Sequence, residues 1–95
     1  MKVKNINGTS DNKCVCGSWI KHWEKHSGRT ALYCSEKSCL QSSELVGAHV
    51  QKTTSDMSWY IIPLCQEHNK SKIELEIADS TIFVSANRSQ TCEKT

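Results

Sequence analysis

The clearest pattern of apolar and polar positions in the first half of the chain lies between Ser18 and Gly28, in the segment S-W-I-K-H-W-E-K-H-S-G. Its ring-bearing residues recur at the helical positions i, i+3, i+4 and i+7, which are Trp19, His22, Trp23 and His26. Ser18 can cap the start of a helix, and Gly28 can end it. The pattern predicts a short helix that packs on the core through its tryptophans.

Two apolar runs in the middle of the chain are typical of strands. Residues 44–50 read E-L-V-G-A-H-V, and residues 59–62 read W-Y-I-I, which is rich in β-branched and aromatic side chains. The polar residues 51–58 connect them, so we expect a hairpin. Because Pro63 has no N–H to donate to a sheet, we expect the second strand to end there and a helix to span about residues 64–72.

The two ends of the chain are less regular. The first dozen residues are polar and contain glycine, which predicts a flexible arm over residues 1–13 and a single domain over residues 14–95. Residues 30–34 are strand-like and lead into a tight loop. Near the other end, I-E-L-E-I alternates with period two and is followed by T-I-F-V-S, which predicts a terminal hairpin, with continuation of the preceding helix through residues 71–77 as the alternative. The order of elements predicts the α+β class, with an N-terminal helix and a C-terminal β segment.

A chain of 95 residues with 37% hydrophobic residues forms only a thin core. Small domains of this kind usually gain stability from disulfides or a structural metal ion, and six cysteines and four histidines could supply either. The chain has no apolar segment typical of a signal peptide or a membrane span, which predicts a cytoplasmic protein with reduced thiols. We therefore expect metal ligands, with a disulfide framework as the alternative. The net charge of +2 permits a nucleic-acid partner without arguing for one.

Two short pairs of potential ligands flank the predicted hairpin. Cys34 and Cys39 lie in the tight loop. Cys65 and His68 lie three residues apart at the predicted helix start, where the positive end of the helix favours a thiolate. A structural Zn²⁺ takes four such ligands in a tetrahedron. A loop, a hairpin and a helix that clamp one ion would form a small zinc-stabilised treble clef.

Further cysteines leave the choice of ligands open. Cys14 and Cys16 are similar to a zinc knuckle, because a glycine follows the second cysteine and relieves the crowded turn. Together with Cys92 and His22 they could form a second zinc site. They could instead complete the site of the helix-start pair in place of the loop pair, or stay reduced and idle.

The stretch from Cys34 to Lys70 resembles the zinc-containing branch of the HNH, or His-Me finger, endonucleases. The matching elements read C-S-E-K-S-C, then E-L-V-G-A-H-V, then Y-I-I-P-L-C-Q-E-H-N, and the stretch covers 37 of the 95 residues. The resemblance implies a ββα treble clef that hydrolyses phosphodiester bonds, with a catalytic Mg²⁺ or Mn²⁺ beside the structural zinc.

Carried over by position, the resemblance implies that His49 is the general base that activates water and that Asn69 holds the catalytic ion, both in one cleft between hairpin and helix. The chain departs from the family at Ala48, where a metal-binding Asp or His is usual, and at Tyr60, where many members have an Asn that orients the base. Two classes of function stay open. One is a metal-dependent nuclease acting on nucleic acid, and the other is an inactive treble-clef module that binds nucleic acid or protein.

Overall fold

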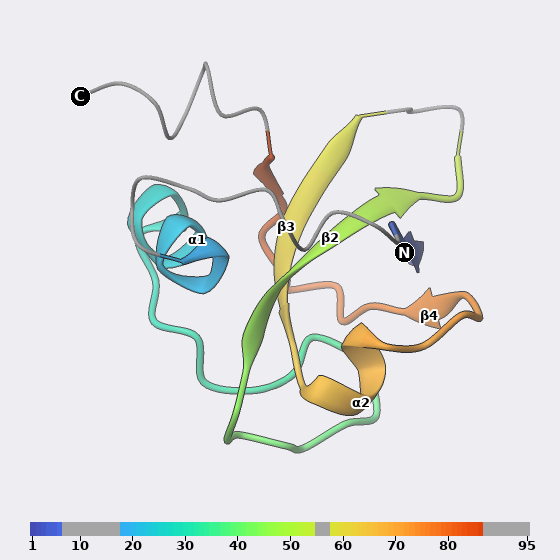
Figure 1. Ribbon diagram of the computed structural model, residues 1–95, viewed down its shortest axis with the longest axis horizontal. Coiled ribbons are helices and arrows are strands. Elements are labelled where there is room, and N and C mark those ends of the chain that lie inside the picture. Colours follow the sequence, from blue (N-terminus) through green and yellow to red (C-terminus); the bar gives the residue numbers. More distant parts are fainter. Residues whose placement is uncertain (7–17, 55–57, 87–95) are drawn as a thin grey trace.

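The structure, a computed structural model, describes residues 1–6, 18–54 and 58–86 of the chain. Within these residues the fold is α+β, with two helices and one antiparallel sheet of five strands in the order β4-β1-β2-β3-β5 (Figure 1). The elements are β1 (Lys2–Asn5), α1 (Trp19–Ser27), β2 (Val46–Lys52), β3 (Trp59–Leu64), α2 (Gln66–Asn69), β4 (Leu75–Glu76) and β5 (Val84–Ser85). Neither helix in this part of the chain is long and apolar enough to cross a membrane.

The hairpin of β2 and β3 is the centre of the sheet. Its register pairs Val46 with Leu64 at one end and Gln51 with Trp59 at the other. Figure 1 shows the two strands running through the middle of the molecule, with α1 beside them and α2 at the end of β3. The hairpin predicted from the two apolar runs is confirmed, although both strands extend two residues further than predicted at their C-terminal ends.

β3 continues through Pro63, where the sequence predicted its end. Pro63 pairs with Gly47 of β2, but its carbonyl accepts a hydrogen bond from the backbone N–H of Ser35 (2.9 Å) on the other edge of the strand. The nitrogen and the carbonyl of one strand residue face the same edge, so the missing N–H of the proline removes no hydrogen bond between β2 and β3. The prediction was wrong because the backbone nitrogen of this buried proline points away from β2.

The first residues of the chain form a strand, not the flexible arm predicted for residues 1–13. β1 lies between β2 and β4, and Val3 pairs with Lys52 on one side and with Leu75 on the other. Val3 is fully buried, so this strand contributes to the core. Residues 7–13, the rest of the predicted arm, lie outside the described residues.

α1 begins and ends where its sequence predicted. The Ser18 side chain accepts a hydrogen bond from the N–H of Lys21, and Gly28 ends the helix in the left-handed conformation, with φ of 74°, which suits glycine. The helix lies so close to β2 that a Cβ at Gly47 would clash with the backbone of Trp19. This close approach explains a glycine in the interior of a strand.

Two apolar clusters lie on opposite faces of the hairpin, because side chains alternate along each strand. The first cluster includes Ala48 and Val50 of β2, and its other buried members are Val3, Cys34, Ile62, Leu64, Cys65, Leu75 and Ile77. The second cluster joins Ile61 of β3 to Trp23 of α1 and Val84 of β5. The candidate metal ligands thus lie on one face of the hairpin, and α1 covers the other.

The segments after β3 differ most from the sequence prediction. The helix predicted over residues 64–72 is the single turn α2, and it does not continue through residues 71–77. The terminal hairpin was also wrong, because β4 pairs with β1 while β5 pairs with β3, at opposite edges of the sheet. Residues 30–34 form no strand, although Glu36 makes a single bridge to Ile77.

Candidate metal centre

Three cysteines and one histidine converge where the loop before β2 meets the start of α2. Cys34 and Cys39 come from the loop, Cys65 is the N-cap residue of α2, and His68 lies on its single turn. All three thiols are free. The ligand atoms that the four residues offer all lie within 4.8 Å of one another. This group, here named the Cys3His cluster, could therefore hold a metal ion such as zinc.

The distances around His68 suit tetrahedral coordination. Its Nδ1 lies 3.2 Å from Sγ of Cys65 and 3.5 Å from Sγ of Cys34. In a tetrahedral zinc site with bonds of about 2.0–2.3 Å, neighbouring ligand atoms are separated by roughly 3.5 Å. The imidazole therefore presents Nδ1, and not Nε2, as its ligand atom.

Backbone hydrogen bonds give the loop the shape that brings its two cysteines together. The N–H of Cys34 donates to the carbonyl of Gln41 (2.8 Å), and the N–H of Cys39 donates to the carbonyl of Glu36 (3.0 Å). The second bond spans three residues and closes a tight turn. This turn allows Cys34 and Cys39 to act as a chelating pair, although their spacing in the sequence is wider than the two intervening residues usual for zinc.

The one-turn helix α2 is fixed to the sheet by β1. The side-chain amide of Asn5 donates to the carbonyls of His68 (2.8 Å) and Ser71 (3.0 Å). These bonds attach α2 and the residues that follow it to β1. Sequence reasoning missed this residue, since an asparagine in a short polar segment is typical of a loop. β1 thus positions the helix that carries the histidine of the cluster.

Burial and mutual contact set the protonation of the thiols. Burial raises the pKa of the Cys34 thiol to about 12. Burial also acts to raise the pKa of Cys65, but hydrogen bonds from the backbone and side chain of His68 outweigh it, so that this pKa is lowered overall. In the ion-free cluster, Cys65 therefore loses its proton more readily than Cys34 does. A bound cation would favour thiolates at both, because a metal ion displaces the protons of the thiols that bind it.

Glu36 lies behind the imidazole of His68. Its Oε2 is 4.0 Å from Nε2, the ring nitrogen that does not face the thiols. Hydrogen bonds from Ser38 hold the carboxylate in place and keep the pKa of Glu36 below its ordinary value. This distance is longer than a hydrogen bond, but a carboxylate on this side of the ring fixes the tautomer and orientation of a metal-binding histidine once it accepts a hydrogen bond from the ring N–H. Sequence reasoning did not single out Glu36, although its place between the two cysteines of C-S-E-K-S-C was an available signal.

His49 lies on the other face of the sheet. Its neighbours in β2 face the apolar cluster that adjoins the Cys3His cluster, and side chains alternate along a strand. The ring of His49 packs edge-on against Trp19 of α1, with ring centres 4.6 Å apart. The residue is only 7% exposed. Burial, and to a lesser extent the nearby His22, lower the pKa of His49 to about 4.

Asn69, the expected partner of His49, is the last residue of α2 and lies next to a ligand of the Cys3His cluster. In the described part of the chain, no hydrogen bond or ring contact joins the side chains of His49 and Asn69. The shared cleft that the resemblance implied is not found among these residues. The catalytic roles of the two side chains stay predictions.

The remaining candidate ligands are placed only in part. Cys14, Cys16 and Cys92 lie outside the described residues, so their use in a second zinc site stays a prediction. His22 is fully buried on α1, and its Nε2 lies 3.0 Å from the carbonyl oxygen of Ser85. Burial lowers the pKa of His22, which favours the neutral imidazole.

No protein-family model, curated protein or solved structure matches this chain. The Cys3His cluster is therefore the feature from which a function has to be inferred.

Proposed function

We propose that this chain is a zinc-stabilised domain in which the Cys3His cluster holds one structural Zn²⁺, in the manner of a treble clef. The proposal rests on one observation, the convergence of four ligand atoms within 4.8 Å from a loop and a helix that the central hairpin separates in the sequence. Three thiols and an imidazole are a common ligand set of structural zinc sites, and thiolates favour zinc over magnesium or calcium.

The number of ligands favours a structural role for the ion. A catalytic zinc usually keeps one position open for water, whereas four protein ligands fill the tetrahedron. The ion would join two segments with little regular structure, since α2 has four residues and the loop carries no strand. Linking such segments through a metal is a common way for a small domain to compensate for a thin core.

The position of His49 favours a binding module over a nuclease. A general base needs access to a water molecule and to the metal ligand that acts with it. His49 is instead buried against Trp19, and a pKa of about 4 makes it a weak base at neutral pH. We therefore propose a module that binds nucleic acid or protein.

Cleavage assays on plasmid and single-stranded DNA with Mg²⁺ or Mn²⁺ test this choice, and we expect no activity. Cleavage by the wild type that is lost in His49→Ala would contradict the binding module and support the nuclease hypothesis.

Native mass spectrometry of the purified chain tests the zinc assignment. We expect at least one zinc per wild-type chain and one fewer in His68→Ala. The matched variant His26→Ala should keep the wild-type content, because His26 is exposed on α1. An unchanged zinc content in His68→Ala, or a metal-free wild type with disulfides among these cysteines, would contradict the proposal.

A further inference from the structure

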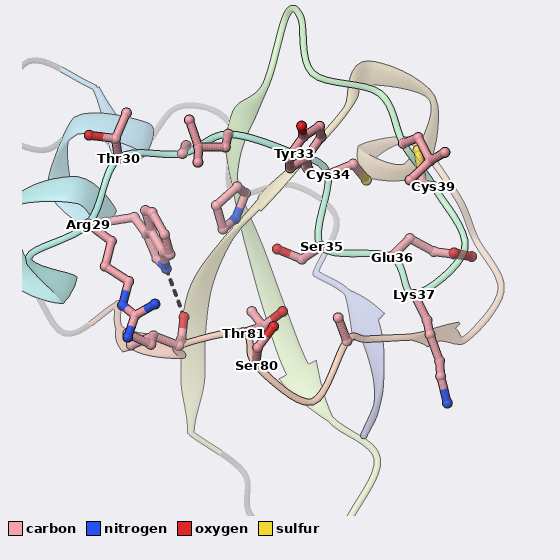
Figure 2. Close-up of a pocket in the computed structure, with 17 residues that line it drawn as sticks. Arg29, Thr30, Tyr33, Cys34, Ser35, Glu36, Lys37, Cys39, Ser80 and Thr81 are labelled. Carbon is pink, nitrogen blue, oxygen red and sulfur yellow. Dashed lines mark hydrogen bonds between the residues drawn. The ribbon is translucent and has the colours of Figure 1, made fainter.

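A pocket of about 320 Å³ lies beside the Cys3His cluster (Figure 2). One wall comes from residues 29–40, which follow α1, and the other comes from residues 78–82, which precede β5. Trp23 and Pro63 line the pocket between these walls. Its volume is at the lower end of the range of small-molecule sites, roughly 300–1,000 Å³.

Hydrogen bonds between the walls fix the shape of the pocket. The N–H of Ala78 donates to the carbonyl of Ser35 (2.9 Å), and the indole N–H of Trp23 donates to the carbonyl of Ile82 (2.7 Å). The N–H of Ser35 also donates to the carbonyl of Pro63 in β3. Both walls are thus tied to regular elements, so a ligand would bind to a preformed site with little ordering of the protein.

The hydroxyl of Ser35 lines the pocket and has no hydrogen-bond partner in the described part of the chain. Ser35 is only 7% exposed, and in the described part of the chain no hydrogen bond involves its side chain. Figure 2 shows this hydroxyl turned into the space between the two walls. The hydroxyl itself is not enclosed by protein, so it is open to the pocket. A ligand atom in the pocket could form a hydrogen bond with it.

Further donors face the same space. Figure 2 shows the hydroxyls of Ser80 and Thr81 directed across the pocket toward Ser35, and the Arg29 guanidinium at one side of the pocket, beside the hydrogen bond from Trp23 to Ile82. Among the described residues, the Arg29 side chain takes part in no ion pair. A guanidinium combined with several hydroxyls is a donor set that binds carboxylates and phosphates.

The rest of the lining suits an apolar group attached to such an anion. Leu32 and Tyr33 are 64% and 59% exposed on one wall, and Trp23 is buried beside them. Glu36 is the acidic residue among those that line the pocket, and Figure 2 shows its carboxylate directed away from the space between the walls. An anion in the pocket would therefore meet donors, not a facing carboxylate.

We propose that this pocket binds a small organic oxyanion, a phosphate monoester or a carboxylate. Its charged group is bound by a guanidinium and three hydroxyls, from Arg29, Ser35, Ser80 and Thr81. Its apolar part lies against Leu32 and Tyr33. This function goes beyond zinc binding, although Cys34 and Cys39 line both the pocket and the metal cluster. The test is therefore made on the zinc-loaded full chain, with zinc content measured on the same sample.

Titrations followed by the NMR signals of backbone amides test the proposal, with phenyl phosphate and benzoate as probes and benzyl alcohol as a neutral control. We expect saturable binding of at least one anion in the millimolar range or tighter, with signal shifts confined to residues 29–40 and 78–82. Benzyl alcohol should cause no saturable shift. The tighter of the two anions identifies phosphate or carboxylate as the preferred group.

Matched variants separate a specific site from general charge attraction. Arg29→Gln should weaken binding at least about tenfold, because it removes a charge-assisted contact. Lys72→Gln removes the same charge at an exposed lysine that does not line the pocket, so it should bind as the wild type does. Ser35→Ala should weaken binding about fivefold, while Ser42→Ala, at an exposed serine that does not line the pocket, should have no effect.

Two results would overturn the proposal. One is the absence of saturable binding of either anion to protein with its full zinc content. The other is equal weakening in Arg29→Gln and Lys72→Gln, which would indicate attraction by net charge alone. Because zinc is measured on the same sample, either result would reject the pocket and leave the zinc assignment standing.

Discussion

The two faces of the central hairpin are built in different ways. On one face, α1 is a capped helix that packs Trp23 against Ile61 and Val84, and it covers His49. On the other face, an irregular loop and the one-turn helix α2 meet at the Cys3His cluster. Both faces carry an apolar cluster, but a regular helix covers the first, whereas irregular segments and candidate metal ligands cover the second.

This difference shows that a small domain can stabilise one face by local helix signals and packing and the other by a bound ion. The α1 face carries its own helix caps and a buried tryptophan, so its structure follows from local signals and packing. On the face of the Cys3His cluster, here called the metal face, the loop and α2 form few regular backbone hydrogen bonds. A bound ion would therefore link these segments and stabilise them. Damage to the two faces should therefore have separable effects on metal content and on the free energy of unfolding.

Removing the metal should have the largest effect. The free energy of zinc binding in small domains is on the order of 10 kcal/mol, comparable to the whole free energy of unfolding of a domain. We expect chelation to abolish the cooperative melting transition seen by circular dichroism, and added zinc to restore it. An unchanged melting curve in demonstrably metal-free protein would mean that the metal face needs no ion.

Truncating Trp23 should have the next largest effect, on the opposite face. Trp23 is 6% exposed and its indole donates a hydrogen bond to Ile82, so Trp23→Ala should lower the free energy of unfolding by about 3–5 kcal/mol. Zinc content at low temperature should stay at the wild-type value. Denaturant unfolding and elemental analysis measure the two quantities.

The matched control is Trp59→Ala, because Trp59 is 44% exposed on β3. Its free energy of unfolding should change by less than about 1 kcal/mol. Loss of zinc in Trp23→Ala under conditions where the chain is folded would show that the two faces are coupled more tightly than their separate clusters indicate.

Protonation of His49 should weaken the α1 face in acid. Its pKa of about 4 in the folded chain lies below the ordinary value of 6.5, so the unfolded chain takes up the proton first as the pH falls. The contribution of neutral His49 to the free energy of unfolding is fully present above about pH 6.5. Up to about 3 kcal/mol of it is lost between pH 6.5 and 4. Denaturant unfolding across this range, in excess zinc, measures the loss.

Comparison of His49→Gln with His26→Gln isolates this effect, because any release of metal in acid is common to both variants. The loss of stability in acid should be smaller in His49→Gln, whereas His26→Gln, at an exposed position, should follow the wild type. Equal pH dependence in the two variants would mean that His49 does not stay neutral in the folded chain.

Glu36→Gln should have the smallest effect, and only on the metal face. Removing a carboxylate that orients a metal-binding histidine typically weakens metal affinity by about 10- to 100-fold. Competition with a chelating indicator measures the affinity, and Glu74→Gln, at an exposed glutamate, is the matched control. Equal affinity in both variants would mean that Glu36 does not position His68.

Local signals in the sequence were sufficient to predict α1 and each of the two ligand pairs of the Cys3His cluster, but not which pairs meet. The caps of α1 depend on Ser18 and Gly28 alone, and helix geometry relates Cys65 to His68 within one turn. The central hairpin followed from two apolar runs joined by a short connection. These features need only contacts between residues close in the sequence, or strands that pair with their neighbours.

Features that depend on distant contacts could not be predicted in this way. β1 is four residues long and pairs with strands far along the chain, so its single buried residue, Val3, gave no periodic signal. The direction in which Pro63 faces depends on Ser35, which no pattern in its own strand indicates. β4 and β5 have two residues each, and they pair with separate strands at opposite edges of the sheet.

X-ray absorption at the zinc edge tests the structural zinc site most directly. The sample is the zinc-loaded double variant Cys14→Ser and Cys16→Ser, so that the described cluster supplies the signal. We predict three sulfur ligands at about 2.3 Å and one nitrogen ligand at about 2.0–2.1 Å for each zinc. Fewer than three sulfurs, oxygen ligands in their place, or a double variant that binds no zinc would contradict the assignment of the ion to Cys34, Cys39, Cys65 and His68.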